Sequence, residues 1–322
     1  MLVRELLAQG ADVISKGRAG ETAWLDATIL WAACIGQRRQ NILASLGEVV
    51  PEDLQFPVTH QTPQTCKIDF TLNAPQRFFA ACKRRATGYP IAYLTGSKEF
   101  FGRDFLVDES VLIPRPETEI LVEWVVETLS GTVFRTNSGL MKPIRLHDCC
   151  TGSGCIPLSL GLEFISRKAQ LITKNDFSLS ASDLSESALE TARLNQLLIA
   201  PEIPINWQLA DLLYGFPLNS IDVLTANPPY VPHEEAIGSS PQSWREPVIA
   251  LDGGADGLDL IRRLVSQASH ALSPGAWFFM EFGDGQSSAI IDILESYGFE
   301  SPEIKCDFSA LPRLVRVRQA GA

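Results

Sequence analysis

The sequence lacks any long hydrophobic run. No stretch of its 322 residues approaches the roughly 18 consecutive apolar positions that a membrane-spanning helix needs. The first residues also lack the charged-then-apolar layout of a secretory signal, and the early acidic residues Glu5, Asp12 and Glu21 argue against a transit peptide. We therefore expect no membrane span and a location in the cytoplasm, or in the mitochondrial matrix if the source is eukaryotic.

An excess of basic residues is missing as well. The 27 lysines and arginines stand against 38 aspartates and glutamates, which gives a net charge of −11. Direct binding to nucleic acid needs a basic face that displaces counterions from the phosphates, so we expect no such partner. The apolar fraction of 45% is ordinary for a globular protein, and the length allows one large domain and a small one.

Cysteines at disulfide or metal-binding spacing are also absent. The seven cysteines contain no C-x-x-C pair, and an odd number in a long chain argues against a disulfide framework. Cys149, Cys150 and Cys155 gather around one loop, but their spacing matches no zinc site. We expect reduced, structural cysteines and no metal centre.

The N-terminal part, residues 1–85, has the pattern of a small helical domain. Trp24, Thr28 and Trp31, with Leu25 beside them, follow the i, i+4, i+7 spacing of one buried helix face. No catalytic constellation occurs here, so we expect this domain to pack on or recruit another molecule. Further helices are expected at residues 41–46 and 74–85.

Residues 86–113 change in character. Segments 89–94 and 99–107 suggest short strands joined by glycine turns, which indicates a β-hairpin linker between two domains. A helix is then expected to start at Glu117 or Thr118.

Strands and helices alternate over residues 114–322. This βαβ series predicts a Rossmann-like α/β domain whose mostly parallel sheet carries helices on both faces. Ligands of such sheets bind beyond the carboxyl ends of the strands. Polar stretches at 130–143 and 165–178 are predicted surface insertions. The expected strands are residues 144–149, 179–182, 207–210, 221–226, 276–281 and 314–317, with one more around Ile304, and the expected helices are residues 156–164, 185–198, 258–272 and 287–297.

The first candidate binding element is the loop Cys150-Thr151-Gly152-Ser153-Gly154, between a predicted strand and a predicted helix. Glycine lets the backbone pass close to a ligand, and a helix N-terminus offers free N–H groups. A dinucleotide-binding motif would have a third glycine where this chain has Pro157. By itself the loop fits either a nucleotide site or a tight turn.

Two aspartates follow the next two strands. Asp183 ends its strand, where a carboxylate can accept hydrogen bonds from both hydroxyls of a ribose. We favour this interpretation over a helix cap, because Ser185 occupies the cap position. Asp211 fits either an acceptor for an adenine amino group or a turn residue.

The most specific element is Asn227-Pro228-Pro229-Tyr230, directly after the apolar run 221–226. Two prolines fix the backbone and remove two N–H donors, so the segment presents carbonyl acceptors in a rigid frame. Two acceptors take both hydrogens of a planar NH₂ group and aim its nitrogen at an electrophilic methyl group. The pattern indicates methylation of an amide or amine nitrogen. A proline-rich turn that merely ends a strand is the simpler alternative.

With these residues, the sequence resembles the HemK/PrmC family of protein-(glutamine-N5) methyltransferases. The resemblance implies S-adenosylmethionine as cofactor and, as substrate, the glutamine of the Gly-Gly-Gln motif in peptide chain release factors. It further implies that residues 1–85 recognise the substrate and that the release factor docks between this domain and the catalytic domain; we expect a monomer. The segments that carry the resemblance are residues 88–96, 113–119, 151–154, Asp183, 227–230 and 246–259.

The resemblance also assigns roles to individual residues. The Asn227 side chain and the Pro228 carbonyl would accept the amide hydrogens of the substrate, with Tyr230 packed on that amide. The implied catalytic residues are Asn227, Pro228, Pro229 and Tyr230. The implied cofactor-binding residues are Cys150, Thr151, Gly152, Ser153, Gly154, Asp183, Asp211, Leu212 and Asn227. The implied substrate-docking residues are Arg115, Glu117 and Glu119.

The chain departs from the family pattern at three places. Cys150 stands where the family usually has glycine, and Leu212 stands where an aromatic residue is common. A late strand reads Met280-Glu281-Phe282-Gly283, where the family more often has Glu-Ile-Gly. These departures concern the cofactor side of the site and leave the amide-binding residues intact.

Three alternatives stay open. A ribosomal-protein glutamine methyltransferase shares the Asn-Pro-Pro-Tyr site but typically departs from the Pro-Glu-Thr-Glu pattern seen at residues 116–119. A DNA adenine-N6 methyltransferase offers similar chemistry, but the acidic charge and the lack of a basic, aromatic recognition segment oppose it. A non-catalytic binding module is opposed by the intact Asn227 and Asp183.

Overall fold

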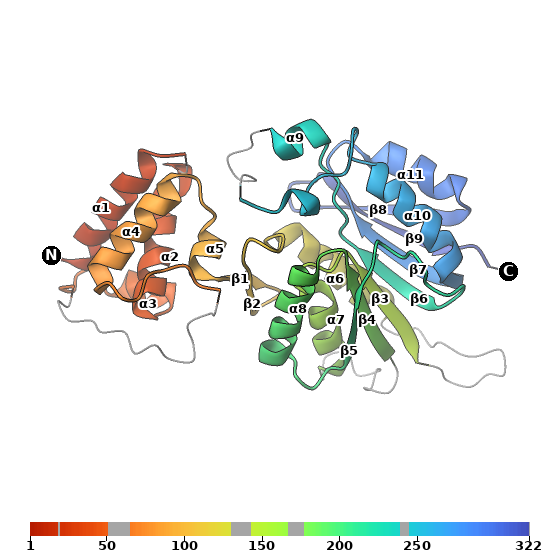
Figure 1. Cartoon of the computed structure of the whole chain (residues 1–322), viewed down its shortest axis with the longest axis horizontal. Helices are drawn as coiled ribbons and strands as arrows, with labels where there is room; N and C mark the ends of the chain where they lie inside the picture. The colour runs from red at the N-terminus through yellow and green to blue at the C-terminus, as the bar shows by residue number, and fades with distance from the viewer. Residues whose placement is uncertain (19, 51–64, 130–142, 167–176, 239–244, 322) are drawn as a thin grey trace. The chain divides into compact units, whose positions relative to one another are not determined.

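A computed structural model describes residues 1–18, 20–50, 65–129, 143–166, 177–238 and 245–321 (Figure 1). The chain forms two compact units. The first comprises Met1–Lys98, Leu106–Glu109 and Ser239–Glu246, and the second comprises Glu99–Phe105, Ser110–Gly238 and Pro247–Ala322. The insertions predicted at 130–143 and 165–178 fall almost entirely outside the described residues.

The first unit is built from short helices. Trp31 and Phe78 meet edge to face in its core, with ring centroids 5.6 Å apart. Gly10 allows this close packing, because a Cβ there would lie 2.3 Å from the Phe78 ring. The helices predicted at 41–46 and 74–85 are confirmed to within two residues. The helices are α1 (Val3–Ser15), α2 (Ala23–Ile35), α3 (Arg39–Ala44), α4 (Ala74–Ala86) and α5 (Ile91–Thr95), with a 3₁₀ turn at Gly20–Thr22.

The predicted buried face of α2 is correct only in part. Thr28 and Trp31 are buried, but Trp24 is 43% exposed and Leu25 is 40% exposed. Helical spacing places residues on a common face, whereas burial needs a neighbouring element over that face. Trp24 and Leu25 lie in the first turn of the helix, where the described residues of this unit leave them open to solvent.

The strand predicted at residues 89–94 is wrong, because these residues lead into helix α5. Pro90 occupies the N-cap and Gly96, with φ +77°, follows the last helical residue. Both positions are ordinary places for these residues at the ends of a helix. A hairpin does occur in this region, but both of its strands come from residues 97–106: β1 (Ser97–Phe100) pairs with β2 (Arg103–Leu106).

The second unit contains a seven-stranded sheet with the order β5-β4-β3-β6-β7-β9-β8. The neighbouring strands β5, β4, β3, β6 and β7 are parallel to one another. Strand β9 pairs antiparallel with both β7 and β8. The predicted mostly parallel, Rossmann-like sheet is therefore confirmed. The strands are β3 (Ile144–Cys149), β4 (Phe177–Asp183), β5 (Ile205–Leu209), β6 (Ile221–Ala226), β7 (Leu272–Glu281), β8 (Phe299–Cys306) and β9 (Pro312–Gln319).

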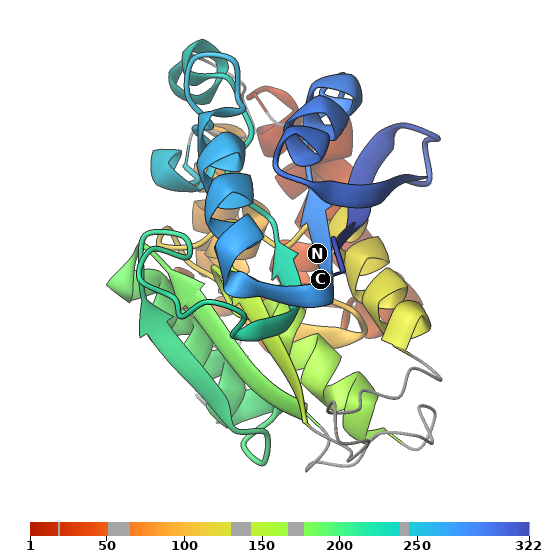
Figure 2. The ribbon, with the colours of Figure 1, turned by 90° about the vertical axis from the view of Figure 1, so that its right-hand side faces the viewer.

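Helices cover both faces of this sheet (Figure 2). A hydrophobic core lies on each face of the sheet, because successive side chains of a strand point to opposite faces. On β6, Val223 packs in the core with α6 and α7, and the next residue, Leu224, packs in the core with α10 and α11. No described helix has both the length and the apolarity needed to cross a membrane. The helices are α6 (Pro116–Leu129), α7 (Cys155–Ile165), α8 (Glu186–Ile199), α9 (His233–Ile237), α10 (Asp259–Ala271) and α11 (Ser287–Ser296), with a 3₁₀ turn at Val248–Ala250.

The loops that follow β3, β4 and β6 meet at the carboxyl end of the central strand β3. Its last residue, Cys149, is in register with Ser182 of β4 on one side and with Ala226 of β6 on the other. The chain leaves β3 for β4 and later returns to β6 on the opposite side, so the strand order reverses at β3. Such a switch point opens a crevice at the carboxyl ends of the strands, and the loops after β3, β4 and β6 border it.

Candidate active site

The loop after β3 relies on its two glycines for different reasons. Both have left-handed backbones, with φ +54° at Gly152 and +77° at Gly154. A Cβ at Gly154 would lie 2.9 Å from the Trp207 ring, so packing requires glycine there. A Cβ at Gly152 would meet nothing within 4 Å and would project into open space. Gly152 therefore keeps the floor of the crevice clear.

Asp183, at the end of β4, fixes this loop. Its Oδ2 accepts a hydrogen bond of 2.8 Å from the Gly152 N–H, and its Oδ1 accepts one of 3.0 Å from the Ser185 N–H. Burial raises the pKa of Asp183, and these backbone donors partly offset that rise. Ser185 caps α8 by accepting from the Ala188 N–H, as the sequence predicted. The carboxylate thus lies at a defined place beside the loop.

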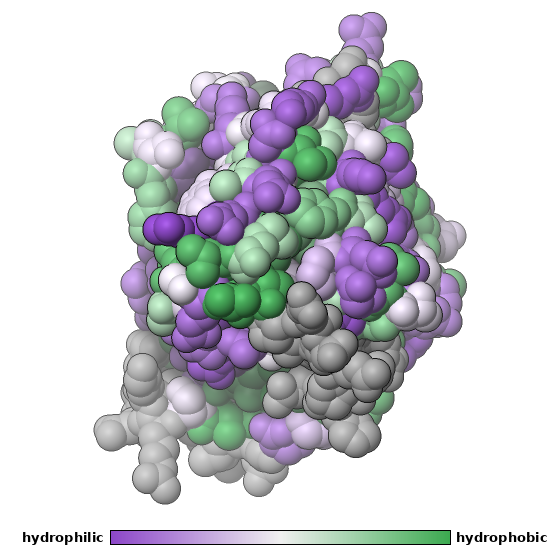
Figure 3. Space-filling view, turned by 90° about the vertical axis from the view of Figure 1, so that its left-hand side faces the viewer, coloured by the Kyte–Doolittle hydropathy of each residue, from purple (hydrophilic) through white to green (hydrophobic). Residues whose placement is uncertain are grey.

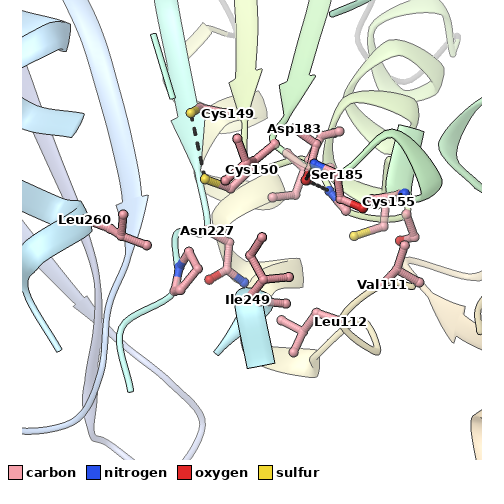
Figure 4. Close-up of a pocket in the computed structure, with 18 of the residues that line it drawn as sticks. Val111, Leu112, Cys149, Cys150, Cys155, Asp183, Ser185, Asn227, Ile249 and Leu260 are labelled. Atoms are coloured by element: carbon pink, nitrogen blue, oxygen red, sulfur yellow. Dashed lines mark hydrogen bonds between the residues drawn. The ribbon is translucent and has the colours of Figure 1, made fainter. Parts of the chain in front are cut away.

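A cavity of about 180 Å³ opens between the strand ends (Figure 4). Asp183 and Asn227 reach it from strands on either side of β3. Ten of the residues that the sequence singled out contribute to its lining: Arg115, Cys150, Thr151, Gly152, Ser153, Asp183, Asp211, Leu212, Asn227 and Pro229. Gly154, Pro228, Tyr230, Glu117 and Glu119 are not part of the described lining.

Asp211 is already engaged in an ion pair at the edge of the cavity. Its Oδ2 lies 2.6 Å from Nη2 of Arg263 on α10, and both side chains are about half exposed. Leu212 beside it is buried and has a left-handed backbone, with φ +54°. An adenine amino group approaching Asp211 would therefore meet a carboxylate that Arg263 already holds in place.

Asn227 has a defined amide orientation. Its Nδ2 donates to Thr118 Oγ1 over 3.3 Å, and the Thr118 hydroxyl donates to Oε2 of Glu281 over 2.6 Å. Tyr230 donates its hydroxyl to the other carboxylate oxygen of Glu281 over 3.1 Å. Among the described residues no donor reaches Asn227 Oδ1. The Asn227 amide oxygen is therefore free to accept, and the residue lines the cavity.

Glu281 is the buried centre of these contacts. It ends β7 and is only 2% exposed. Burial raises its pKa, and hydrogen bonds from the Thr118 and Tyr230 hydroxyls and from the Asn227 amide act in the opposite direction. Burial also raises the pKa of the Tyr230 phenol, and the Glu281 charge adds to that rise, so Tyr230 stays neutral and serves as a donor.

The three predicted docking residues lie in or just before the first turns of α6. Arg115 lines the cavity. Glu117 is partly exposed, and its charge contributes to the raised pKa of Glu281. Glu119 accepts a 2.9 Å hydrogen bond from the Phe101 N–H and thereby holds the turn of the β1–β2 hairpin. Their role in docking a substrate stays a prediction.

The sequence did not predict several of the residues around the cavity. Thr118 belonged to a segment that the sequence marked, but only its charged neighbours were assigned a role. Glu281 had the signal of a carboxylate that ends a buried strand, the same signal that singled out Asp183. No local pattern marked Arg263 or the apolar lining, because sequence-distant segments supply them. These lining residues include Val111, Leu112, Leu184, Ile249, Ala250 and Leu260.

The cavity fits S-adenosylmethionine in the chemistry of its lining. The loop at Thr151–Ser153, with the open space over Gly152, would hold the methionine part. Asp183 would accept from the ribose hydroxyls, and Leu212 and Ile249 offer apolar surface to a flat base. The Cys149 thiol 3.9 Å away, together with burial, holds the pKa of the Cys150 thiol well above its usual value, so this residue is a neutral part of the wall.

Comparison with known proteins identifies relatives across most of the chain. No protein-family model matches it. A release factor glutamine methyltransferase of Clostridium acetobutylicum is 32% identical over 281 residues, which cover 86% of this chain and 90% of the relative. The protein of the same description from Moorella thermoacetica is 36% identical and covers 74% of this chain and 78% of its own. The one from Bradyrhizobium diazoefficiens is 30% identical and covers 93% and 89%.

Solved structures show a weaker likeness. The E. cuniculi Mtq2–Trm112 complex, responsible for methylation of the translation termination factor eRF1, matches with 19% identity and a TM-score of 0.41 over 66% of this chain and 99% of that one. Likeness at this level carries no argument about substrate or partner. The sequence relatives are sufficient, because identities of 30–36% extend over at least 74% of this chain and 78% of each relative. This chain belongs to the family of release factor glutamine methyltransferases.

Proposed function

We propose that this protein transfers a methyl group from S-adenosylmethionine to the side-chain amide nitrogen N5 of the glutamine in the Gly-Gly-Gln motif of peptide chain release factors. The family relationship supports the reaction class and the substrate. The observation that carries the proposal is the orientation of Asn227. Its nitrogen is bound to Thr118, while its oxygen has no donor among the described residues. Asn227 lines the cavity together with Gly152 and Asp183.

The hydrogen-bond acceptors of the site would help an amide nitrogen to react. An amide nitrogen is a weak nucleophile, because its lone pair is delocalised into the carbonyl group. Bound S-adenosylmethionine supplies a methyl group on a positively charged sulfur. Asn227 Oδ1 and the Pro228 carbonyl would accept the two hydrogens of the substrate amide, which orients the nitrogen and raises its electron density. Pro228 and Pro229 keep this frame rigid and free of competing N–H donors.

We also propose the division of labour between the parts of the chain. Residues 1–85 serve as a helical substrate-recognition domain, residues 86–113 as a hairpin linker, and residues 114–322 as the catalytic domain. Arg115, Glu117 and Glu119 contribute to docking of the release factor. The protein acts as a monomer in the cytoplasm, where peptide release takes place, or in the mitochondrial matrix of a eukaryote.

The decisive experiment locates the methyl group. A release factor is incubated with the enzyme and isotopically labelled cofactor, and mass spectrometry then maps the label. We expect it on the glutamine of the Gly-Gly-Gln motif. Label on a ribosomal protein or on DNA adenine instead would replace this proposal with one of its alternatives.

Asn227→Ala tests the mechanism within the same assay. The variant should keep cofactor binding although Asn227 lines the cavity, because Asp183 and the glycine loop are intact. Turnover should fall by on the order of 100-fold, since one preorganised acceptor is lost. Calorimetry gives the cofactor affinity and label incorporation gives the turnover. Unchanged turnover would contradict the role of Asn227.

A further inference from the structure

Three structural elements meet at one buried carboxylate. Glu281 ends β7, Thr118 lies in the first turn of α6, and Tyr230 follows β6. Thr118 and Glu281 are each 2% exposed. One Glu281 oxygen accepts from Thr118 and the other accepts from Tyr230. Burying a carboxylate against two neutral hydroxyls costs free energy that an apolar side chain would avoid, so the arrangement calls for a reason other than stability.

The hydroxyl of Thr118 has one hydrogen, and Glu281 determines where that hydrogen goes. The 2.6 Å contact runs from the Thr118 hydroxyl to Glu281 Oε2, so it commits the Thr118 hydrogen to Glu281. The remaining lone pairs of Thr118 Oγ1 can only accept. Asn227 must therefore turn its NH₂ group toward Thr118, as the 3.3 Å contact from Nδ2 records.

The opposite orientation of Asn227 would defeat the site. If Thr118 donated to Asn227 Oδ1, the Asn227 NH₂ group would face the cavity. The NH₂ group of the substrate amide would then meet the NH₂ group of Asn227. Both are donors, so Asn227 would accept neither hydrogen of the substrate. The two orientations of a carboxamide have nearly the same shape, so packing alone does not select between them.

We propose that Glu281, acting through Thr118 and through its own contact with the amide, sets the orientation of the Asn227 carboxamide and is thereby a positioning group for methyl transfer. This inference rests on the proposed function, because it assigns the purpose of the free Asn227 oxygen to binding the substrate amide. Glu281 is not part of the described lining of the cavity, and Thr118 acts by holding the Asn227 nitrogen. Their effect is to leave the Asn227 oxygen free to accept.

The test compares Thr118→Val with Thr118→Ser. Valine keeps the shape of the side chain and removes the hydroxyl, whereas serine keeps the hydroxyl. We expect kcat on a release factor to fall on the order of 10- to 100-fold in Thr118→Val, as for other groups that orient a reacting residue. Thr118→Ser should restore kcat to within about threefold. The cofactor Kd, measured by calorimetry, should be the same in both variants.

Thr128→Val is the matched control on the same helix. Thr128 donates to the Trp124 carbonyl and accepts from Arg316, three turns away from Thr118. This variant removes a hydroxyl of the same kind from α6, and its kcat should equal that of the unaltered enzyme. Melting temperatures of all variants establish that each one is folded.

A double variant separates positioning from any general effect on structure. In an Asn227→Ala background, Thr118→Val should cause no further loss of kcat, because its whole effect acts through Asn227. Equal kcat for Thr118→Val and the unaltered enzyme, equal losses in the Val and Ser variants, or a full additional loss in the double variant would each overturn the inference. Absence of methylation by the unaltered enzyme would instead refute the proposed function.

Discussion

Gly152 and Gly102 share a backbone conformation but differ in what surrounds them. Both have positive φ, +54° and +72°, and a Cβ at either one would meet nothing within 4 Å. The space beside Gly152 is the cavity, whereas Gly102 lies in the turn of the β1–β2 hairpin. This pair allows backbone strain to be separated from obstruction of the site.

We predict that Gly152→Ala and Gly102→Ala each lower the free energy of unfolding by about 1 kcal/mol, the cost of a left-handed alanine. Only Gly152→Ala should weaken cofactor binding, because its methyl group enters the cavity. Urea unfolding and calorimetric titration with S-adenosylmethionine measure the two effects. Equal cofactor affinity in both variants would show that the cofactor does not lie over Gly152.

His147 illustrates how burial makes a single residue sensitive to pH. His147 lies in β3 and its side chain is buried. Its Nδ1 is 2.8 Å from Ser180 Oγ and its Nε2 is 2.9 Å from Ser182 Oγ. Burial lowers its pKa from 6.5 to about 3. Between these two values the unfolded chain binds a proton that the folded chain does not, so stability is lost as the pH falls.

The predicted contribution of His147 is a loss of about 2 kcal/mol in the free energy of unfolding between about pH 7.5 and pH 5. Urea unfolding at both values measures it, with His147→Gln as the comparison, since glutamine does not titrate. The loss on acidification should be smaller in the variant by this amount. An identical loss in both proteins would assign the pH dependence to other groups.

At the scale of elements, an ion pair at the beginning of two strands holds the sheet in register. Asp222 at the start of β6 is 2% exposed and accepts from Nε and Nη2 of Arg145 at 2.9 and 2.8 Å, and also from the Arg145 N–H at 3.0 Å. Arg145 starts β3. These contacts lie at the opposite ends of the strands from the cavity, so they affect the site only through the fold.

Asp222→Ala should therefore lower the free energy of unfolding by on the order of 2–3 kcal/mol, because several charge-assisted hydrogen bonds are lost at a buried position. Glu127→Ala breaks the exposed contact with Lys305 and should cost less than about 1 kcal/mol. Denaturant unfolding measures both, and the folded Asp222 variant should still bind cofactor. Equal destabilisation by the two changes would contradict the importance of the strand-end pair.

At the scale of the whole molecule, the helical unit carries apolar side chains that its own core does not cover. Figure 3 shows apolar side chains gathered in the middle of one face, bordered by hydrophilic ones. The exposed large apolar residues of this unit are Met1, Trp24, Leu25, Leu43 and Val49. Exposed apolar surface of this kind often marks a binding site, which agrees with the proposed recognition role.

We predict that Trp24→Ser and Leu25→Ser raise the KM for a full-length release factor about fivefold or more, since an anchor residue of an interface contributes roughly 1 kcal/mol or more. The kcat and the cofactor affinity should stay unchanged. Leu218→Ser is the control, because Leu218 is 71% exposed in the catalytic unit. An unchanged KM in both Trp24→Ser and Leu25→Ser would remove these side chains from substrate recognition.

Local sequence determined the regular elements and the residues that end the strands. The sequence predicted β3 and β6 to the residue, because turn-forming residues such as Pro143 and Asn227-Pro228 delimit these strands. The same reasoning placed Asp183 and Asn227 at one edge of the sheet, since parallel strands share that edge. It failed at residues 89–94, where aromatic and β-branched residues resemble a strand but the Pro90 and Gly96 positions produce a helix.

The sequence by itself determined the strands and helices of the sheet and the segment Asn227-Pro228-Pro229-Tyr230, because each depends on residues adjacent in the chain. The strand order, and with it the switch point at β3, came from the tertiary structure. Only the tertiary structure decided that Arg263 pairs with Asp211, that Trp24 faces solvent, and that Thr118 links Asn227 to Glu281. Thr118 and Asn227 are 109 residues apart. No local pattern encodes such contacts, because the folding of the whole sheet brings α6, β6 and β7 together.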